Sequence, residues 1–328
     1  MHIKYFMKGK PIRIEFLEAV APMADGDHDK TLNLDVSEVQ LHFYDFANNY
    51  NASSAISQAK DIFDNYHLDV TKKLIFFVPG YKSHISRKTE NLMRDTFKDV
   101  PNSYLMIVDH SVYTSARGGK IESYARSVRY AYYIAQVVAD FLVVLYTKGY
   151  PASGMHCVGH SLGAQILGYA GNAFFGRTNK KIWRITGLDP AGPCFSNSFI
   201  EEQLRSGAAG YVEVYHCNAG GLGTTSALAD IDFFFNDEGA NQPHCGSAYI
   251  PVLGSSQVAK CNHKACVKYW TRTVEHPQWY LAWRCDSYRN FRKGRCAANE
   301  VTIAGYSNPG NSTGVFYVST DGYGFTEP

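Results

Sequence analysis

Residues 159–163, with the sequence Gly-His-Ser-Leu-Gly, are the part of this chain best suited to carry out chemistry. A serine on a very tight strand-to-helix turn exposes its hydroxyl, and such a turn accepts only small residues two positions before and after the serine. Because the bare pattern arises by chance in about one chain in ten of this length, the flanking residues matter. Residues 155–158 form a short apolar run, and residues 164–170 are typical of the start of a helix. The sequence therefore predicts a nucleophile elbow at Ser161.

A nucleophilic serine needs a base, and the base needs a group that orients it. Asp189 ends the run 182–188 and precedes a proline, so we expect it at the carboxyl end of a strand, beside the crevice of a parallel sheet. An Asp-Pro pair also begins ordinary turns, and its position alone leaves both interpretations open.

The order serine, acid, histidine is typical of hydrolases with this elbow, and the histidines after Asp189 are His216, His244, His263 and His276. His263 follows Cys261 closely, where a disulfide would hold an otherwise mobile loop carrying the base. His216 ends an apolar run and fits a buried strand-end histidine equally well, whereas the polar turn around His276 is typical of the surface.

A second chemical feature follows the apolar run 73–78, where Pro79 and Gly80 turn the chain sharply. A backbone N–H exposed at this turn could face the negative charge that develops on a substrate carbonyl oxygen. One such donor lowers a reaction barrier by roughly 3–4 kcal/mol. An ordinary strand-to-loop turn would give the same sequence pattern.

Composition and periodicity predict a globular α/β protein. With 45% hydrophobic and 19% charged residues, the 328 residues can bury a sizeable core, and a net charge of +2 without basic runs gives no reason to expect nucleic-acid binding. The apolar segment 121–148 is interrupted by charged residues, so we expect a core helix and no membrane span. Strand-like and helix-like runs alternate along the chain, which predicts a mostly parallel sheet with helices on both faces. Strands are expected near 39–46, 74–79, 104–109, 155–158, 182–188, 211–216 and 314–319, and helices near 53–66, 86–98, 121–147 and 163–174.

Taken together, these motifs resemble the animal pancreatic-type lipases, which include triacylglycerol lipases, phospholipases A1 and secreted insect lipases. The resemblance implies an α/β-hydrolase fold with Ser161 as nucleophile, Asp189 as orienting acid and His263 as base. It also implies an oxyanion hole made by the backbone N–H groups of Tyr81 and Leu162. Pro79 stands where the family has a histidine, which is a departure from the family pattern. The matching stretches are residues 41–44, 75–80, 158–164, 186–195, 232–235, 261–263 and 314–317.

The resemblance also implies a domain organisation and a substrate class. We expect residues 1–328 to form one lipase domain without the C-terminal β-sandwich of many relatives, and hence no colipase partner. The lid would run from Gly246 to Lys260 and carry Tyr249, Ile250, Val252 and Leu253 as apolar residues. This lid and the segment 217–229 are both short, which makes the chain similar to the phospholipase A1 branch. Neutral-lipid lipase and galactolipase activity stay open, as does a simple disulfide-closed loop without a gating role.

The chain has eight cysteines, an even number, and several of them lie in expected loops. This pattern suggests disulfides and an oxidising compartment. Family position implies the pairs Cys245–Cys261 and Cys285–Cys296. Cys194 and Cys217 follow strands that should be neighbours, so this pair is a further expectation, with Cys157 as a buried thiol and Cys266 left unexplained.

The sequence gives no sign of a metal or cofactor. The cysteines lack C-x-x-C spacing, which argues against zinc. Relatives hold calcium with acids shortly after the Asp-Pro motif, whereas this chain has Ile200, Arg205 and Ala208 there, so we expect no calcium.

Glycosylation sequons at Asn51 and Asn311 favour a secreted protein. Residues 1–10 lack the apolar core of a signal peptide, so an export signal would lie outside this sequence or be unusual. The expected function is serine-dependent hydrolysis of lipid esters at a membrane or emulsion surface. The alternatives are a small-ester carboxylesterase and a lipid-binding protein similar to insect yolk proteins, which keep this fold without the nucleophile.

Overall fold

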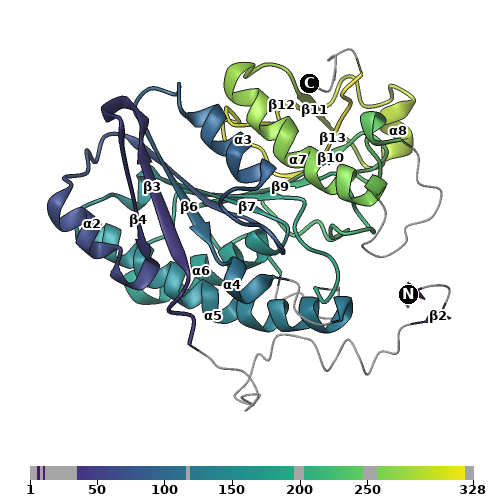
Figure 1. Ribbon diagram of the computed structural model, residues 1–328. Coiled ribbons are helices and arrows are strands. Elements are labelled where there is room, and N and C mark those ends of the chain that lie inside the picture. The colour runs from purple at the N-terminus through teal and green to yellow at the C-terminus, as the bar shows by residue number, and fades with distance from the viewer. Residues whose placement is uncertain are drawn as a thin grey trace.

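A large, mostly parallel sheet forms the centre of the computed structural model, which describes residues 6–7, 10–11, 35–115, 119–195, 203–246 and 257–321 (Figure 1). The strands are β1 (Phe6–Met7), β2 (Lys10–Pro11), β3 (Gln40–Asp45), β4 (Tyr50–Ala55), β5 (Lys73–Val78), β6 (Ser103–Asp109), β7 (Met155–His160), β8 (Arg184–Leu188), β9 (Tyr211–His216), β10 (Ile231–Phe235), β11 (Leu281–Arg284), β12 (Val301–Ile303) and β13 (Gly314–Val318). The α-helices are α2 (Lys60–Asn65), α3 (Lys88–Phe97), α4 (Ser111–Thr114), α5 (Lys120–Thr147), α6 (Leu162–Thr178), α7 (Gln257–Glu275) and α8 (Tyr288–Arg292).

The strand order of the large sheet is β12-β11-β13-β10-β9-β8-β7-β5-β6-β3-β4. The central strands run parallel to one another, and they are β13, β10, β9, β8, β7, β5 and β6. The pair β3–β4 and the pair β11–β12 close the two edges in antiparallel fashion. A mostly parallel sheet with helices on both faces and an elbow after a central strand is the α/β-hydrolase fold, which confirms the predicted fold class.

Strand β5 shows how the two faces of the sheet are buried. Leu74, Phe76 and Val78 point into a core shared with α5 and α6, whereas Ile75 and Phe77 point into a core shared with α3 and α7. All five side chains are fully buried. A continuous apolar run of this kind is what a parallel strand needs when helices cover both of its faces. Figure 1 shows α3 and α7 on one side of the sheet and α5 and α6 on the other.

Helix α5 belongs to the core, as the sequence predicted. Its segment Glu122–Thr147 is long and apolar enough to cross a membrane by length and composition alone. One face of the helix, however, carries fully buried side chains such as Val128, Ile134 and Leu142, which pack with residues of α6 and the sheet. Packing of this face against the rest of the core accounts for the burial.

Three parts of the sequence fold differently from the expectation. Residues 50–55, expected partly as helix, form the edge strand β4, whose polar side chains alternate between exposed and half-buried. Strands β10, β11 and β12 were absent from the expected set. The segment around His263, expected as a loop, is the middle of helix α7.

Candidate active site

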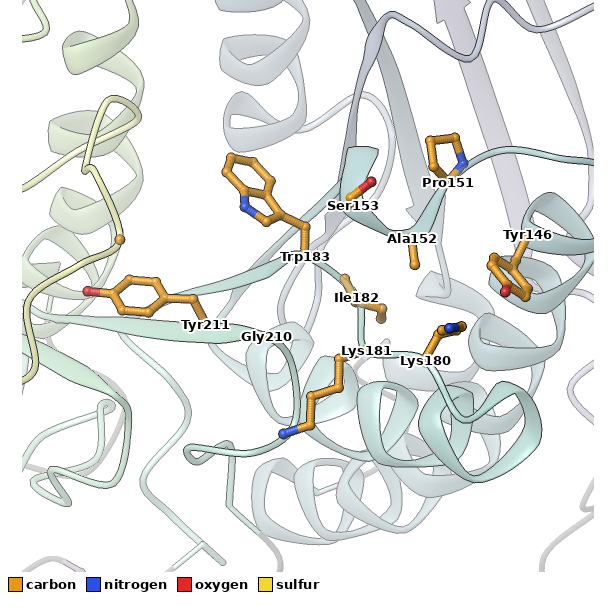
Figure 2. Close-up of a pocket in the computed structure, with 11 residues that line it drawn as sticks. Tyr146, Pro151, Ala152, Ser153, Lys180, Lys181, Ile182, Trp183, Gly210 and Tyr211 are labelled. Carbon is orange, nitrogen blue, oxygen red and sulfur yellow. The ribbon is translucent and has the colours of Figure 1, made fainter.

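The residues expected to carry the chemistry lie at the carboxyl edge of the parallel strands. Ser161 follows β7, and Asp189 follows β8. A cavity of about 570 Å³ lies at the opposite edge, where Trp183 precedes β8 and Tyr211 begins β9 (Figure 2). Because ligands of open α/β sheets bind outside the carboxyl ends of the strands, the candidate active site is at the edge that holds Ser161.

Ser161 adopts the strained backbone conformation of a nucleophile elbow. Its φ of 57° and ψ of −121° lie where residues other than glycine are rare. Hydrogen bonds hold this turn on both sides: the N–H of Ser161 donates to the Leu188 carbonyl at 3.0 Å, and its own carbonyl accepts from Ala191 and Ala164, both at 3.1 Å. The serine is therefore fixed between the end of β8 and the first turn of α6.

Both glycines of the motif are required by close backbone contacts. A Cβ atom at Gly163 would lie 2.0 Å from the carbonyl oxygen of Val78, and one at Gly159 would lie 2.5 Å from the Cα of Ala164. Real Cβ atoms do not approach other atoms this closely. The structure thus gives the steric reason for the spacing that the sequence analysis singled out.

Asp189 is fully buried, and its carboxylate is held by hydrogen bonds on both oxygens. Oδ1 accepts from the backbone N–H groups of Cys217 and Asn218, at 2.8 and 2.9 Å. Oδ2 lies 2.5 Å from Nδ1 of His263. A buried carboxylate is tolerated only when it is paired and hydrogen-bonded. Here the bonds to Oδ1 hold the carboxylate in place, and Oδ2 orients the ring of His263.

His263 lies in helix α7, and not in a mobile loop as expected. Its side chain is about one-tenth exposed, and it faces the sheet from a helix whose buried residues include Asn262 and Cys266. A helix has fixed side-chain directions, so the imidazole is positioned by secondary structure as well as by the disulfide that the sequence indicated.

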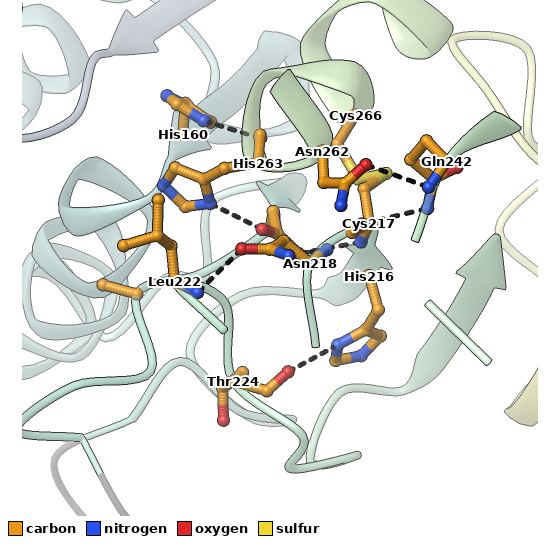
Figure 3. A network of polar contacts seen from close by, with 12 residues as sticks. His160, His216, Cys217, Asn218, Leu222, Thr224, Gln242, Asn262, His263 and Cys266 are labelled. Atoms are coloured by element: carbon orange, nitrogen blue, oxygen red, sulfur yellow. Dashed lines mark hydrogen bonds and ion pairs between the residues drawn. A yellow bond between two sulfur atoms is a disulfide. The ribbon is translucent and has the colours of Figure 1, made fainter. Parts of the chain in front are cut away.

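Two disulfides flank His263 along α7. Cys261 pairs with Cys245, as the resemblance implied, and Cys266 pairs with Cys217 (Figure 3). Because Cys217 also donates its N–H to Asp189, the second disulfide joins the backbone that binds Asp189 to the helix that carries His263.

The expected pair Cys194–Cys217 is wrong, since Cys217 faces α7 and Cys194 is a free thiol. Burial raises the pKa of Cys194 to about 12. Cys157 is a free buried thiol as expected, and Cys285 pairs with Cys296.

The other histidines after Asp189 are occupied elsewhere. His216, at the end of β9, donates from Nδ1 to the Thr224 carbonyl at 3.1 Å, and its Nε2 lies 2.9 Å from Asp232. It stacks on Phe234 and has no exposed side-chain surface. His276 is near the surface, stacked on Trp279. His244 forms a contact with Tyr269 at 3.4 Å.

The turn after β5 lies directly against Ser161. A Cβ atom at Gly80 would lie 2.8 Å from the Cβ of Ser161. His110, which follows β6, donates from Nε2 to the Pro79 carbonyl at 2.9 Å and thus supports the turn where the family histidine is replaced. Sequence analysis missed His110, because nothing in its surroundings separates it from any other buried histidine.

The two N–H groups of the expected oxyanion hole belong to Tyr81 and Leu162. Leu162 is the first residue of α6, where backbone N–H groups lack intrahelical acceptors. The Tyr81 hydroxyl lies 2.9 Å from the Ser123 hydroxyl, and its ring contacts Tyr124 on α5. These contacts fix the side chain of Tyr81, whose backbone adjoins Gly80.

Most of the expected lid lies outside the described residues. This applies to Tyr249, Ile250, Val252 and Leu253, and also to Ile200 of the expected calcium-binding stretch. Gly246 ends a short 3-10 helix, whereas Lys260 lies in the first turn of α7. The loop between Cys245 and Cys261 therefore includes the start of this helix.

Potential metal ligands cluster twice among the described residues, at His244, Cys245 and Cys261 and at Cys285, Asp286 and Cys296. In each cluster the two cysteines form a disulfide, so neither offers the thiolate that a metal ion binds.

The arrangement is suited to acyl transfer, in which an oriented imidazole activates a serine hydroxyl. The Asp189–His263 contact is formed, and His160, the neighbour of Ser161, lies against His263 with their ring centroids 4.7 Å apart. Within the described part of the chain, no hydrogen bond links the Ser161 hydroxyl to the His263 ring. Such bonds often tighten only when substrate binds.

The family model described as "Lipase" matches residues 18–310. The chain belongs to the lipase family. Lipase member H from Mus musculus is 31% identical over 70% of this chain and 49% of its own length. Pancreatic lipase-related protein 2 from Rattus norvegicus is 28% identical over 76% of this chain and 54% of its own. Pancreatic lipase-related protein 3 from Homo sapiens is 34% identical over 53% of this chain and 39% of its own length. These matches confirm the resemblance to animal pancreatic-type lipases, and the chain spans about half the length of the curated relatives it matches.

Replacing Gly163 by alanine should disrupt the elbow of this lipase-family chain. The added methyl group would meet the Val78 carbonyl, so we expect a loss of about 3 kcal/mol or more in the free energy of unfolding. Gly176 lies in the same helix with no heavy atom within 4 Å of its Cβ position. Gly176→Ala should be neutral or stabilising by up to about 1 kcal/mol. Urea unfolding of both variants measures the difference, and equal stabilities would contradict the steric account.

Removing the disulfide between Cys217 and Cys266 should affect both stability and activity. The double alanine variant opens a loop of 49 residues, for which we expect a loss of about 4 kcal/mol. The matched control removes Cys285 and Cys296, which close a loop of 11 residues far from Asp189; the expected loss is about 3 kcal/mol. Thermal unfolding and ester hydrolysis per folded molecule distinguish them. Only the first variant should lose activity, and an equal loss in both would show that the link from Cys217 to α7 does not position the base.

Proposed function

We propose that this chain hydrolyses carboxylic esters of lipids, with Ser161 as nucleophile, His263 as base and Asp189 as orienting acid. The observation that supports this most strongly is the buried Asp189–His263 hydrogen bond at the same sheet edge as a serine with a positive φ. Strained backbone at a non-glycine residue is frequent at catalytic sites. Membership of the lipase family agrees with this chemistry.

In the proposed mechanism, Nε2 of His263 takes the proton of the Ser161 hydroxyl while the serine oxygen attacks the ester carbonyl. The N–H groups of Tyr81 and Leu162 donate to the oxyanion that forms. His263 then protonates the leaving alcohol, which leaves an acyl group on the serine. Water, activated by the same imidazole, releases the fatty acid. Asp189 accepts the Nδ1–H of His263 throughout and stabilises the imidazolium whenever it forms.

Phospholipid is the substrate class that we propose, with attack at the first acyl position as in phospholipases A1. The support is the shortness of the segment after Cys217, which folds back tightly on itself through the bond from the Gly223 N–H to the Asn218 carbonyl at 3.1 Å. A compact loop leaves space beside the serine for a polar headgroup. Neutral glycerides and galactolipids are the alternatives that the same geometry accepts.

A secreted, glycosylated protein acting at a lipid surface is the setting that we propose for this activity. Three disulfides lie within the described residues, and disulfides persist mainly in oxidising compartments. Both sequon asparagines, Asn51 and Asn311, are exposed, so their side chains are accessible to glycosylation.

Ser161→Ala should abolish ester hydrolysis without unfolding the protein, because alanine keeps the turn and removes only the hydroxyl. Hydrolysis of a soluble fluorogenic ester, compared with the thermal unfolding midpoint, measures both properties. We expect a loss of at least about 1,000-fold in kcat. Activity near that of the unsubstituted protein would exclude this serine as the nucleophile.

Substrate class is tested by comparing phosphatidylcholine vesicles with triolein emulsions. A phospholipase releases fatty acid from the first faster than from the second, whereas a neutral-lipid lipase gives the reverse. Activity on a soluble short-chain ester, with none on either lipid, would indicate a carboxylesterase. Binding of vesicles without turnover of any ester would indicate a lipid-binding protein.

A further inference from the structure

His160 contacts two separate parts of the candidate active site besides preceding Ser161 in the chain. Its Nε2 lies 3.1 Å from the carbonyl oxygen of His263 on α7. On the opposite side of its ring, a Cβ atom at Gly80 would lie 3.3 Å from Nδ1. The residue is only 4% exposed. The neighbour of the proposed nucleophile is therefore hydrogen-bonded to the backbone of the proposed base (Figure 3).

This contact determines where the proton of His160 lies. A carbonyl oxygen only accepts hydrogen bonds, so Nε2 must carry the proton and donate it. The His263 carbonyl can accept this bond in addition to its helical one, because it has two lone pairs. Nδ1 is then bare in the neutral ring, and within the described part of the chain this buried atom has no hydrogen-bond partner.

The surroundings of His160 favour its neutral form. Burial is the main cause that lowers its pKa well below the usual value, and the His263 ring and Lys264 on α7 lower it further, against an opposing contribution from the hydrogen bond to the His263 carbonyl. Neutrality matters for catalysis, because His263 becomes positively charged when it takes the serine proton. A second positive charge on an adjacent ring would oppose that step.

We propose that His160 is a positioning residue, which holds the backbone of His263 at a fixed distance from Ser161 through its Nε2–H. Because His160 and Ser161 share a peptide bond, this single hydrogen bond links nucleophile and base directly. The proposal rests on the proposed function of Ser161 and His263. Losing the bond would allow α7 to shift, so productive alignment would be rarer at each turnover, and kcat would fall while substrate binding stayed the same.

Two substitutions of equal length separate this role from simple packing. His160→Gln places an amide N–H four bonds from Cα, as histidine places Nε2, whereas His160→Met has the same length without a donor. We expect the glutamine variant to keep kcat on a soluble ester within about threefold, and the methionine variant to lose about tenfold in kcat with KM unchanged. Both should show unfolding midpoints close to that of the parent protein.

Either of two outcomes would overturn the proposal. Full activity of the methionine variant would show that the hydrogen bond is not needed. Equal losses in both folded variants would show that the imidazole itself is required, for example as a proton relay.

A measurement on the unsubstituted protein keeps the test valid if the methionine variant does not fold. In a sample with ¹⁵N-labelled histidine, the ring signals of His160 are assigned by their loss in His160→Gln. We expect the neutral ring of His160 to be the Nε2–H tautomer. An Nδ1–H tautomer would contradict the proposal. If the parent protein hydrolyses no ester, the proposed function fails, whereas the tautomer still decides whether the hydrogen bond exists.

Discussion

The hydrogen bond between Asp189 and His263 is the interaction on which the rest of this site depends. It joins the end of β8 to helix α7 through two residues that are 74 positions apart in the chain. The carboxylate is fully buried, so its burial is tolerable only because Cys217, Asn218 and His263 all donate to it. Loss of any donor would leave part of a charge unpaired in the protein interior, and loss of His263 would also remove a polar contact between α7 and the end of β8.

Strain at the site is supported by the parallel sheet around it. Ser161 and Asp189 both have positive φ angles, 57° and 46°, and each such residue costs roughly 1–3 kcal/mol. Each strained residue is bound to the next strand of the sheet, since the Ser161 N–H donates to the Leu188 carbonyl of β8 and the Asp189 N–H donates to the Tyr215 carbonyl of β9. Neighbouring parallel strands therefore hold both conformations at the same edge. The disulfide from Cys217 to Cys266 extends this rigid frame to the helix that carries His263.

A structural feature could be predicted from the sequence when it leaves a pattern in neighbouring residues of the chain. The elbow was predictable, because its glycine spacing is visible in the chain, even though the carbonyl that Gly163 must avoid belongs to Val78 on distant β5. The strands of the central sheet were predictable from continuous apolar runs such as residues 73–78. Asp189 was accessible in the same way, as an acid at the end of such a run. His263 was chosen by chain order and family resemblance, while its helical setting was missed because the cysteines around it suggested a crosslinked loop.

Features that depend on distant partners could not be predicted. To predict the pair Cys217–Cys266, one must know which side of β9 faces α7. The expected partner of Cys217, Cys194, is closer to it in the sequence than Cys266 is. His110 and His160 gave no signal, because a buried histidine that donates to a carbonyl has no characteristic sequence neighbours. Both nevertheless support the site, one at the Pro79 turn and the other at the backbone of the base.

The central claim is that Ser161 is activated by an imidazole that Asp189 orients. Reaction with a fluorophosphonate ester, mapped by mass spectrometry of the peptides, tests this most directly, because such reagents label only an activated serine. The account predicts one equivalent of label, located on Ser161, and a large fall in labelling rate for Asp189→Asn in a protein that remains folded. Absence of label, label on another serine, or an unchanged rate in the asparagine variant would contradict it.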